Sequence, residues 1–366
     1  MGYACAIASL TRRSFLGGTL AWTTILLAGC GQAQSGPPAS SKPGASGATS
    51  PAGSPKPAVP GTASAVKGAW VAITANQMIW PLALDAGYFD KYGVNFTLQY
   101  VQGSVTSVQA LVAGDLQMVQ VAGSAVVAAQ ASKQDLVLAA GYIDRLFWRI
   151  MGLASITSLD QLRGKTIGVG KVGNADYFAW TLLAQKQGWK MEDFQFVNAG
   201  DSQGQVTLLQ KGAVQGTALS PPQDLQAQQV GAHLLLDEAQ YNQPEQQLGV
   251  ALPLAYIAKN RTTALNVLKA TIEAIHRWKT DAPFAKGVIK KYLKNDDQAY
   301  IDAGYSAYTP LFLQAPYPNA QGFQAVIDEV ATQQPQAKNV TPAQCMDTSL
   351  LKELEDSGFI KQLYGS

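Results

Sequence analysis

The sequence from residue 66 onward predicts an α/β fold with two lobes, each built on a largely parallel sheet. Short runs rich in β-branched residues alternate with longer stretches whose apolar residues recur at helical spacing, which is the pattern of strand–helix–strand units. The stretch 66–366 is long enough to bury a core in each of two lobes. Gly, Ser, Asn or Asp stands between most strands and the helices that follow them, as expected of tight connections.

The first lobe is predicted to contain four strands with helices between them. The strands are expected at 70–73, 94–101, 116–121 and 135–142. A helix after the first strand carries Trp80, Leu84 and Tyr88 at helical spacing. Two further helices are expected at 104–111 and 124–133.

The chain is expected to cross to the second lobe at 148–156 and to return at 249–257. Between these crossings, strands are predicted at 166–170, 194–197, 214–219 and 234–236. The rest of the chain is helical in pattern. The expected organisation is therefore the first part of lobe 1 at 66–150, lobe 2 at 151–248, and the second part of lobe 1 with the C-terminal helices at 249–366.

The N-terminal segment 1–29 has the features of an export signal and not of a folded domain. Arg12 and Arg13 precede an apolar stretch that is too short and too interrupted for a membrane span. The stretch ends at Leu27-Ala28-Gly29-Cys30, which resembles the sequence cut by the lipoprotein signal peptidase. We therefore expect a twin-arginine lipoprotein signal and a lipid on Cys30. An ordinary signal, or an uncleaved anchor that happens to hold a cysteine, is the alternative.

The segment 30–65 consists mostly of Gly, Ser, Pro, Ala and Thr after its first residue. Such a segment has too little apolar surface to fold and is predicted to be a disordered tether. A cell-wall spacer would have the same composition. Both interpretations hold the protein body away from lipid, and we expect an exported protein that is lipid-anchored at the outer face of the cytoplasmic membrane.

Charge and cysteine content exclude several classes of partner and cofactor. Of the 27 Lys and Arg residues, Arg12 and Arg13 belong to the signal, and the remaining 25 balance the 25 Asp and Glu residues. A near-neutral chain gives no reason to expect nucleic acid or an anionic lipid patch as partner. Only Cys345 remains after processing, so no intramolecular disulfide is expected. Because the chain has only 2 His residues, no metal site is predicted, and no cofactor either.

Polar residues at the ends of the predicted strands form the candidate ligand site. In an open α/β sheet the ligand lies at the carboxyl ends of the strands, and the helix N-termini found there suit anions or carbonyl groups. Each of these residues taken alone could equally be a helix cap. The candidate positions are Asn76, Gln77, Ser104, Ser124, Asn174, Asp176 and Ser220.

Aromatic residues and one ion pair extend the candidate site. Trp80 and Tyr177 lie next to predicted helix starts, where they would supply the apolar wall of a pocket for a small organic solute. Trp148 is expected in the core. Asp144 and Arg145 follow a strand end, where an Arg could pair with an anionic ligand group. A solvated surface pair is the alternative for these two residues.

Sequence signatures of catalysis are absent from the chain. It contains no Gly-x-Ser-x-Gly turn, no phosphate-binding Gly-rich loop with Lys, and no metal-ligand spacing of His, Cys and Asp. His233 precedes an apolar strand, and His276 lies within a predicted helix. Both are interpreted as structural. We therefore expect a binding protein and not an enzyme.

An ordered series of short segments runs through most of residues 68–360. The series comprises 80–94, Gly103-Ser104, 111–115, Gly123-Ser124, 162–169, 212–215, Ser220-Pro221-Pro222 and 346–350. In this order the segments resemble the periplasmic substrate-binding proteins of sulfonate, nitrate and taurine ABC importers, which are grouped with thiamine-pyrimidine synthesis proteins as the SsuA/THI5-like or NMT1-like family.

The resemblance implies a type II periplasmic-binding fold, in which two α/β lobes joined by two crossings close over a ligand cleft. It also implies an ABC permease and an ATPase as partners, and a monomer is expected of a tethered donor. Carried onto this sequence, the ligand positions would lie near Asn76, Gln77, Ser104, Ser124, Asn174 and Ser220.

Two departures from the family pattern concern the solute. Gln215 stands where many relatives have an acidic residue, and the loop 143–147 matches no specificity pattern. The solute class therefore stays open among sulfonates, nitrate or taurine, and thiamine-pyrimidine-like heterocycles. A ligand sensor without transport is one alternative function. A pyrimidine-precursor synthase-like enzyme is another, although that branch uses a histidine and a cysteine-rich motif, and this chain has no cysteine cluster.

Overall fold

The computed structural model of the protein describes residues 64–365. The expected signal at 1–29, Cys30 and nearly all of the expected tether lie outside the described residues. The last two residues assigned to the tether, Ser64 and Ala65, belong to the first strand. The described part of the chain lies within one compact unit.

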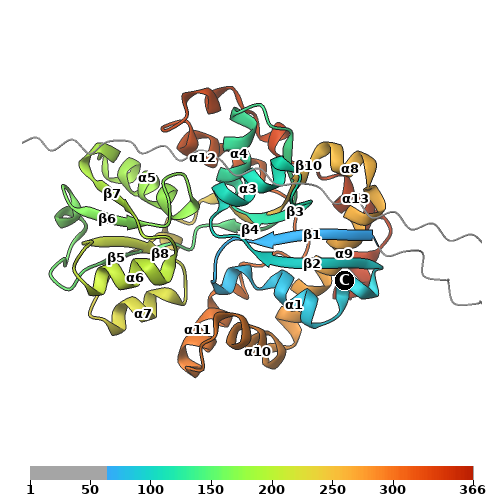
Figure 1. Cartoon of the computed structure of the whole chain (residues 1–366), viewed down its shortest axis with the longest axis horizontal. Coiled ribbons are helices and arrows are strands. Elements are labelled where there is room, and N and C mark those ends of the chain that lie inside the picture. The colour runs from blue at the N-terminus through green and yellow to red at the C-terminus, as the bar shows by residue number, and fades with distance from the viewer. Residues whose placement is uncertain (1–63, 366) are drawn as a thin grey trace, which may run out of the picture. The chain divides into compact units, whose positions relative to one another are not determined.

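The first sheet contains five strands in the order β2-β1-β3-β10-β4 (Figure 1). Strand β1 pairs in parallel with β2 and β3, whereas β10 runs antiparallel between β3 and β4. The strands are β1 (Ser64–Trp70), β2 (Val94–Tyr100), β3 (Met118–Val121), β4 (Leu136–Arg145) and β10 (Pro244–Pro253).

The second sheet also contains five strands, in the order β7-β6-β8-β5-β9. Its parallel strands β7, β6 and β8 repeat the arrangement of β2, β1 and β3, and β5 is the antiparallel strand. The strands are β5 (Arg149–Gly152), β6 (Thr166–Val169), β7 (Gln195–Asn198), β8 (Gly216–Leu219) and β9 (His233–Asp237).

The two sheets therefore have the same strand order. In each sheet the antiparallel strand, β10 or β5, directly follows the last strand of the other sheet along the chain. The chain crosses twice, at 146–148 between β4 and β5 and at 238–243 between β9 and β10. The two crossings are joined by the Glu238 amide, which donates to the Trp148 carbonyl oxygen at 2.9 Å, and by Trp148 Nε1, which donates to Gln247 Oε1 at 3.0 Å.

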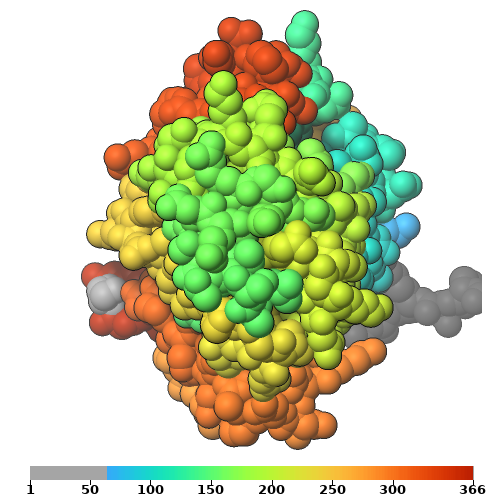
Figure 2. Space-filling view, turned by 90° about the vertical axis from the view of Figure 1, so that its left-hand side faces the viewer, coloured from blue at the N-terminus to red at the C-terminus, as the bar shows by residue number. Residues whose placement is uncertain are grey.

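Helices connect the strands within both sheets. The first sheet has η1 (Ala75–Gln77), α1 (Ile79–Asp85), α2 (Tyr88–Lys91), α3 (Ser104–Ala113) and α4 (Gly123–Ala131). The second has η2 (Leu159–Leu162), α5 (Ala175–Gln187), η3 (Met191–Asp193), α6 (Ser202–Gln210), α7 (Gln223–Gln229) and η4 (Glu238–Tyr241). Seen from the side of the second sheet, its residues, coloured green to yellow, cover most of the face (Figure 2).

The C-terminal helices return to the first sheet and complete its core. Helix α9 packs on α1, and α12 packs on α4 and β10. Trp80 and Trp278 are fully buried in this core, and Trp80 Nε1 donates to Thr271 Oγ1 at 3.0 Å. These helices are α8 (Leu254–Lys259), α9 (Arg261–Thr280), α10 (Ala282–Leu293), α11 (Gln298–Tyr308), α12 (Ala320–Val330), η5 (Pro335–Asn339), η6 (Pro342–Cys345), α13 (Ser349–Asp356) and α14 (Phe359–Tyr364).

The predicted α/β class is confirmed, but several predicted strands have different bounds, and the first strand and the returning strand differ most. Strand β1 is Ser64–Trp70 and not 70–73, because the half-buried alternating segment and not the continuous apolar run pairs with β2 and β3. The returning strand begins at Pro244 and not at 249. None of the helices in the described part is long and apolar enough to span a membrane.

Candidate functional site

A cavity of about 270 Å³ lies between the two sheets. Loops that follow β1, β2 and β3 of the first sheet and β6, β7 and β8 of the second all contribute residues to its lining. The parallel strands of both sheets thus direct their carboxyl ends at one space, which is where open α/β sheets bind ligands. The first crossing also contributes, through Phe147 and Trp148, and so does β10 directly after the second crossing, through Gln247 and Leu248.

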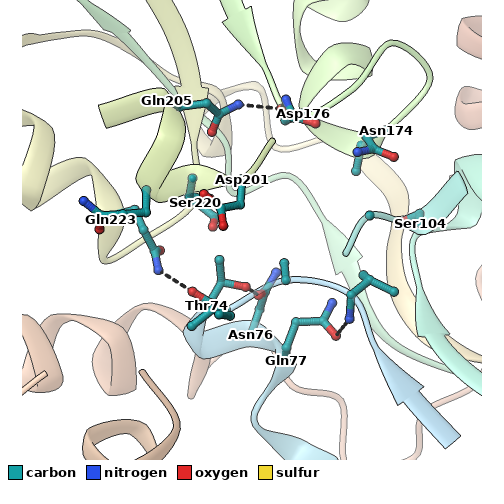
Figure 3. A pocket seen from close by; sticks show the side chains of 18 of the residues that line it. Thr74, Asn76, Gln77, Ser104, Asn174, Asp176, Asp201, Gln205, Ser220 and Gln223 are labelled. Atoms are coloured by element: carbon teal, nitrogen blue, oxygen red, sulfur yellow. Dashed lines mark hydrogen bonds between the residues drawn. The ribbon is translucent and has the colours of Figure 1, made fainter. Parts of the chain in front are cut away.

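The first sheet supplies one wall, formed by the loop after β1 and the start of α3. Thr74, Asn76 and Gln77 lie together on this wall (Figure 3). Thr74 Oγ1 donates to Asn76 Oδ1, and Gln120 Nε2 donates to the Gln77 carbonyl oxygen at 3.1 Å. These bonds fix the loop, so the amide groups are held in place before any ligand arrives.

The second sheet supplies the opposite wall, where Asp176 is the central group. It is only 9 % exposed, and its Oδ2 accepts hydrogen bonds from the Gly170 amide at 2.5 Å and from Gln205 Nε2 at 2.6 Å. Burial removes water from the carboxylate and raises the pKa of Asp176 to about 6, although the donors partly oppose this effect. Asp201 caps helix α6 through Oδ1, which accepts from the Gly204 amide at 2.8 Å.

Two hydrogen bonds join the walls across the cavity. Gln223 Nε2 of α7 donates to the carbonyl oxygen of Ile73 at 2.9 Å. The Val105 amide of α3 donates to Asn174 Oδ1 at 3.4 Å. Because each bond links one lobe to the other, both are made only when the lobes are close together.

Six of the predicted site residues line this cavity: Asn76, Gln77, Ser104, Asn174, Asp176 and Ser220. They come from both sheets. The other five predicted positions, Trp80, Ser124, Asp144, Arg145 and Tyr177, are not part of the lining.

The two predicted aromatic ligand contacts are core residues. Trp80 is fully buried and bonded to Thr271. Tyr177 is buried in the second lobe, where its ring lies 4.9 Å from that of Phe196 and 5.7 Å from that of Phe178. Position next to a helix start does not fix the direction of a side chain, and in both helices these rings face inward.

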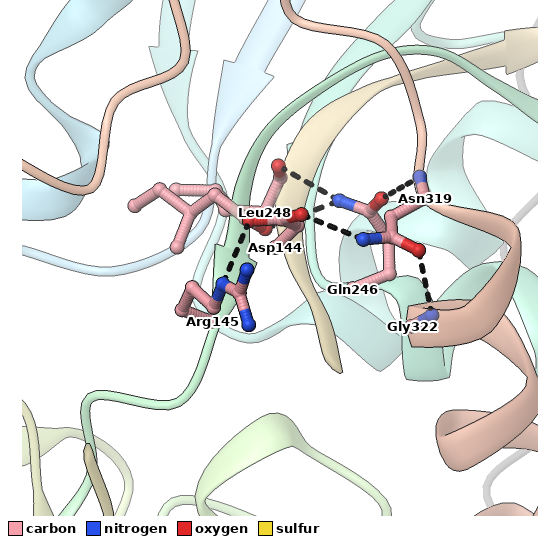
Figure 4. Close-up of polar contacts among 7 residues, drawn as sticks. Asp144, Arg145, Gln246, Leu248, Asn319 and Gly322 are labelled. Carbon is pink, nitrogen blue, oxygen red and sulfur yellow. Dashed lines mark hydrogen bonds and ion pairs between the residues drawn. The ribbon is translucent and has the colours of Figure 1, made fainter. Parts of the chain in front are cut away.

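The remaining three positions, Ser124, Asp144 and Arg145, lie outside the lining of the cavity. Helix α4 begins against β10, so closely that a Cβ at Gly123 would lie 2.5 Å from the Gln246 carbonyl oxygen. Its N-cap residue Ala122 belongs to the lining, and Ser124 does not. Asp144 accepts a hydrogen bond from Asn319 Nδ2 at 2.7 Å (Figure 4). Arg145 Nε lies 3.7 Å from Asp144 Oδ1, and the Arg145 side chain is 46 % exposed, whereas Asp144 is buried.

Sequence reasoning missed several carboxamides and aromatic rings of the lining. The unpredicted carboxamides are Gln102, Gln203, Gln205, Gln223, Gln226 and Gln247, and the unpredicted rings are Phe147, Trp148 and Tyr300. Gln102 directly precedes the predicted pair Gly103-Ser104 and could have been found from it. Tyr300 comes from α11, far along the sequence, and no local signal marks it.

The charged groups of the lining are Asp176 and Asp201, and no Lys, Arg, His or Cys of residues 64–365 belongs to it. Within the same residues no group of His, Cys, Asp and Glu is arranged to hold a metal ion. The arrangement is therefore suited to hydrogen-bonding a small molecule between two walls.

Comparison with known proteins assigns the family. A model described as NMT1/THI5 like matches residues 75–281, which is more than half of the chain. The chain belongs to this family. No match was found among curated proteins.

Several solved structures share the fold of this chain. One from Bordetella bronchiseptica has a TM-score of 0.73 at 18% identity and covers 83% of this chain and 98% of its own. The periplasmic aliphatic sulphonate binding protein SsuA from Escherichia coli has 0.60 at 16%, covering 78% and 91%. The periplasmic nitrate-binding protein NrtA from Synechocystis has 0.61 at 11%, covering 80% and 89%. The type II periplasmic-binding fold expected from the sequence is confirmed.

Proposed function

We propose that this protein binds a small solute in the cavity between its two sheets and delivers it to an ABC importer. The observation that carries the proposal is the convergence of six strand ends, the first crossing and β10 on one cavity lined by carboxamides and aromatic rings. A pocket with apolar walls and a few placed polar groups is suited to holding a small organic solute. Membership of the NMT1/THI5-like family and the likeness to SsuA and NrtA support the same function.

The two crossings give the protein a means of signalling that the solute is bound. A solute that touches both walls favours the state in which the lobes are close, so binding shifts the population towards that state. The bonds from Gln223 to Ile73 and from Val105 to Asn174 would form in the same step. The permease would then distinguish loaded from empty protein by the distance between the lobes.

The location of this function follows from the N-terminal sequence. A twin-arginine signal at 1–29 would export the protein, a lipid on Cys30 would anchor it, and the tether to residue 65 would let a monomer reach the permease and its ATPase. The division into lobes at 66–150, 151–248 and 249–366 is part of the same proposal. Labelling of cells with a radioactive fatty acid tests the anchor, because Cys30→Ser would abolish labelling.

A thermal-shift screen of the purified protein tests solute binding. The panel would contain alkane- and arylsulfonates, taurine, nitrate, bicarbonate, pyrimidine precursors and flavins. A ligand at a hundred times its Kd adds about 2.7 kcal/mol to stability, which raises the Tm by about 5 °C. A shift that disappears in Asn174→Ala supports the cavity as the site. Unchanged Tm with every compound would contradict the proposal.

A further inference from the structure

The cavity has an unusual charge balance for a protein whose structural neighbours bind anions. SsuA and NrtA are named for sulphonate and nitrate binding. Here the charged groups of the lining are the carboxylates of Asp176 and Asp201. Within residues 64–365 neither carboxylate forms an ion pair with Lys or Arg. An anion placed at this wall would be repelled by both groups.

Arg149 of the second sheet does not correct this balance, because its charge is already paired. Arg149 of β5 is bonded to two carboxylates: Asp224, which is fully buried, and Asp237, whose Oδ2 lies 3.3 Å from Arg149 Nε. Its positive charge is therefore already compensated. Asp224 also lies in the first turn of α7, so this side of the cavity gains no net positive charge from the pair.

Helix N-termini make the two walls different from each other. On the second wall, α5 has Asp176 in its first turn and α6 has Asp201 as its N-cap, so a carboxylate already satisfies the partial positive charge of each N-terminus. On the first wall, α3 and α4 have no acidic residue in the first turn, and Gly103, Ser104 and Ala122 from their starts line the cavity. The first wall therefore attracts electron-rich groups, and the second attracts positive ones.

Aromatic rings add to the attraction for a positive group. Phe147, Trp148 and Tyr300 all line the cavity, and aromatic faces attract ammonium and guanidinium groups. Carboxylates and rings without an opposing Lys or Arg form the usual environment of a bound organic cation. Asp201 is the more accessible of the two acids, because it is only half-buried, whereas Asp176 is 9 % exposed and its Oδ2 already accepts two hydrogen bonds.

We propose that the solute carries a protonated amine or amidine that binds Asp201 in the field of Asp176, and a hydrogen-bond acceptor that faces the starts of α3 and α4. The inference rests on the proposed function, since it concerns the solute of the same cavity. It makes Asp201 the residue that determines specificity. Simple monoanions such as nitrate or an unsubstituted sulfonate would then be poor ligands.

The inference can be tested with matched pairs of compounds that differ only in the cationic nitrogen. Titration calorimetry at pH 7.5 would compare 3-aminopropanesulfonate with propanesulfonate, and benzamidine with benzamide. A charge-assisted hydrogen bond predicts a preference of about 10- to 100-fold for the cationic member. Asp201→Asn should remove most of that preference while keeping the fold, because Asn is as good an N-cap as Asp. Asp115→Asn is the control, since Asp115 is exposed and lies beyond the opposite end of α3.

The possible outcomes distinguish failure of the cation inference from failure of the proposed solute binding. A preference for the cationic members that Asp201→Asn abolishes and Asp115→Asn retains supports the inference. Binding of propanesulfonate, nitrate or any other panel compound without a cationic nitrogen, at an affinity equal to or above that of the amines, would overturn it and leave solute binding intact. If neither the pairs nor the screening panel gives any binding, solute binding itself is contradicted.

Discussion

Three buried glutamates at the second crossing make the stability of this protein depend on pH. Glu238 lies in η4, Glu245 at the start of β10 and Glu329 in α12, and all are buried. The carboxyl groups of Glu245 and Glu329 interact directly, and Gln247 Nε2 donates to Glu245. Among the described residues none of the three glutamates has an ion-pair partner. Their ionised forms are therefore unfavourable in the fold.

The size of the pH effect on stability follows from the pKa shift of one glutamate, Glu245. Burial raises the pKa of Glu245 from its ordinary value of 4.5 to about 7, and it raises the pKa values of Glu238 and Glu329 as well. The folded state thus holds a proton that the unfolded state releases, so stability falls as pH rises through this range. At about 1.4 kcal/mol per pH unit, Glu245 alone lowers the free energy of unfolding by about 3 kcal/mol between pH 4.5 and pH 8.

Glu245→Gln removes this titration and should flatten the pH dependence. Urea unfolding at pH 5, 6, 7 and 8 would show the variant more stable than the native protein at pH 8, by about 3 kcal/mol, with little difference at pH 5. Glu192→Gln is the control, since Glu192 is exposed. Parallel pH profiles for the native protein and Glu245→Gln would refute the reasoning, as would equal flattening by Glu192→Gln.

Three further predictions concern the cavity and the core. Trp148→Ala removes a cavity ring and the bond to Gln247, and calorimetry should show about tenfold or weaker solute binding with unchanged circular dichroism. Gln223→Ala breaks the bond to Ile73. At about 1 kcal/mol, this loss should lower the ratio of closed to open protein about fivefold in fluorescence energy transfer between labelled lobes, and an unchanged distance distribution would argue against a role in closure. Trp80→Ala empties a fully buried site and should cost about 3–5 kcal/mol in urea unfolding, whereas a small loss would favour the original prediction that Trp80 faces a ligand.

Local patterns were sufficient for the fold class and for about half of the predicted site. Asn76, Ser104 and Ser220 come soon after the carboxyl ends of β1, β2 and β8, and the carboxyl ends of parallel strands meet in one place whichever solute is bound. The same reasoning failed for Trp80 and Tyr177, because the spacing along a helix shows that a side chain belongs to an apolar face but not what that face packs against.

Contributions from distant parts of the chain could not be predicted in this way. Phe147 and Trp148 line the cavity because they lie on a crossing, and a crossing has no periodic pattern. Tyr300 reaches the cavity from a helix that packs beside η1, although more than two hundred residues separate them in the sequence. Such contacts depend on the tertiary arrangement, for which one sequence gives no local signal.

The placement of β10 also dictates the order in which the chain can assemble. Among the strands of the first sheet, β4 pairs only with β10, and β10 is made about a hundred residues after β4. The strands of the second sheet are all present once residue 237 has emerged, since β9 pairs with the earlier β5. The lobe that begins first in the sequence is therefore completed last, because β4 has no partner strand until residue 253 is available. A truncation before residue 244 would leave the second sheet complete and the first sheet without β10.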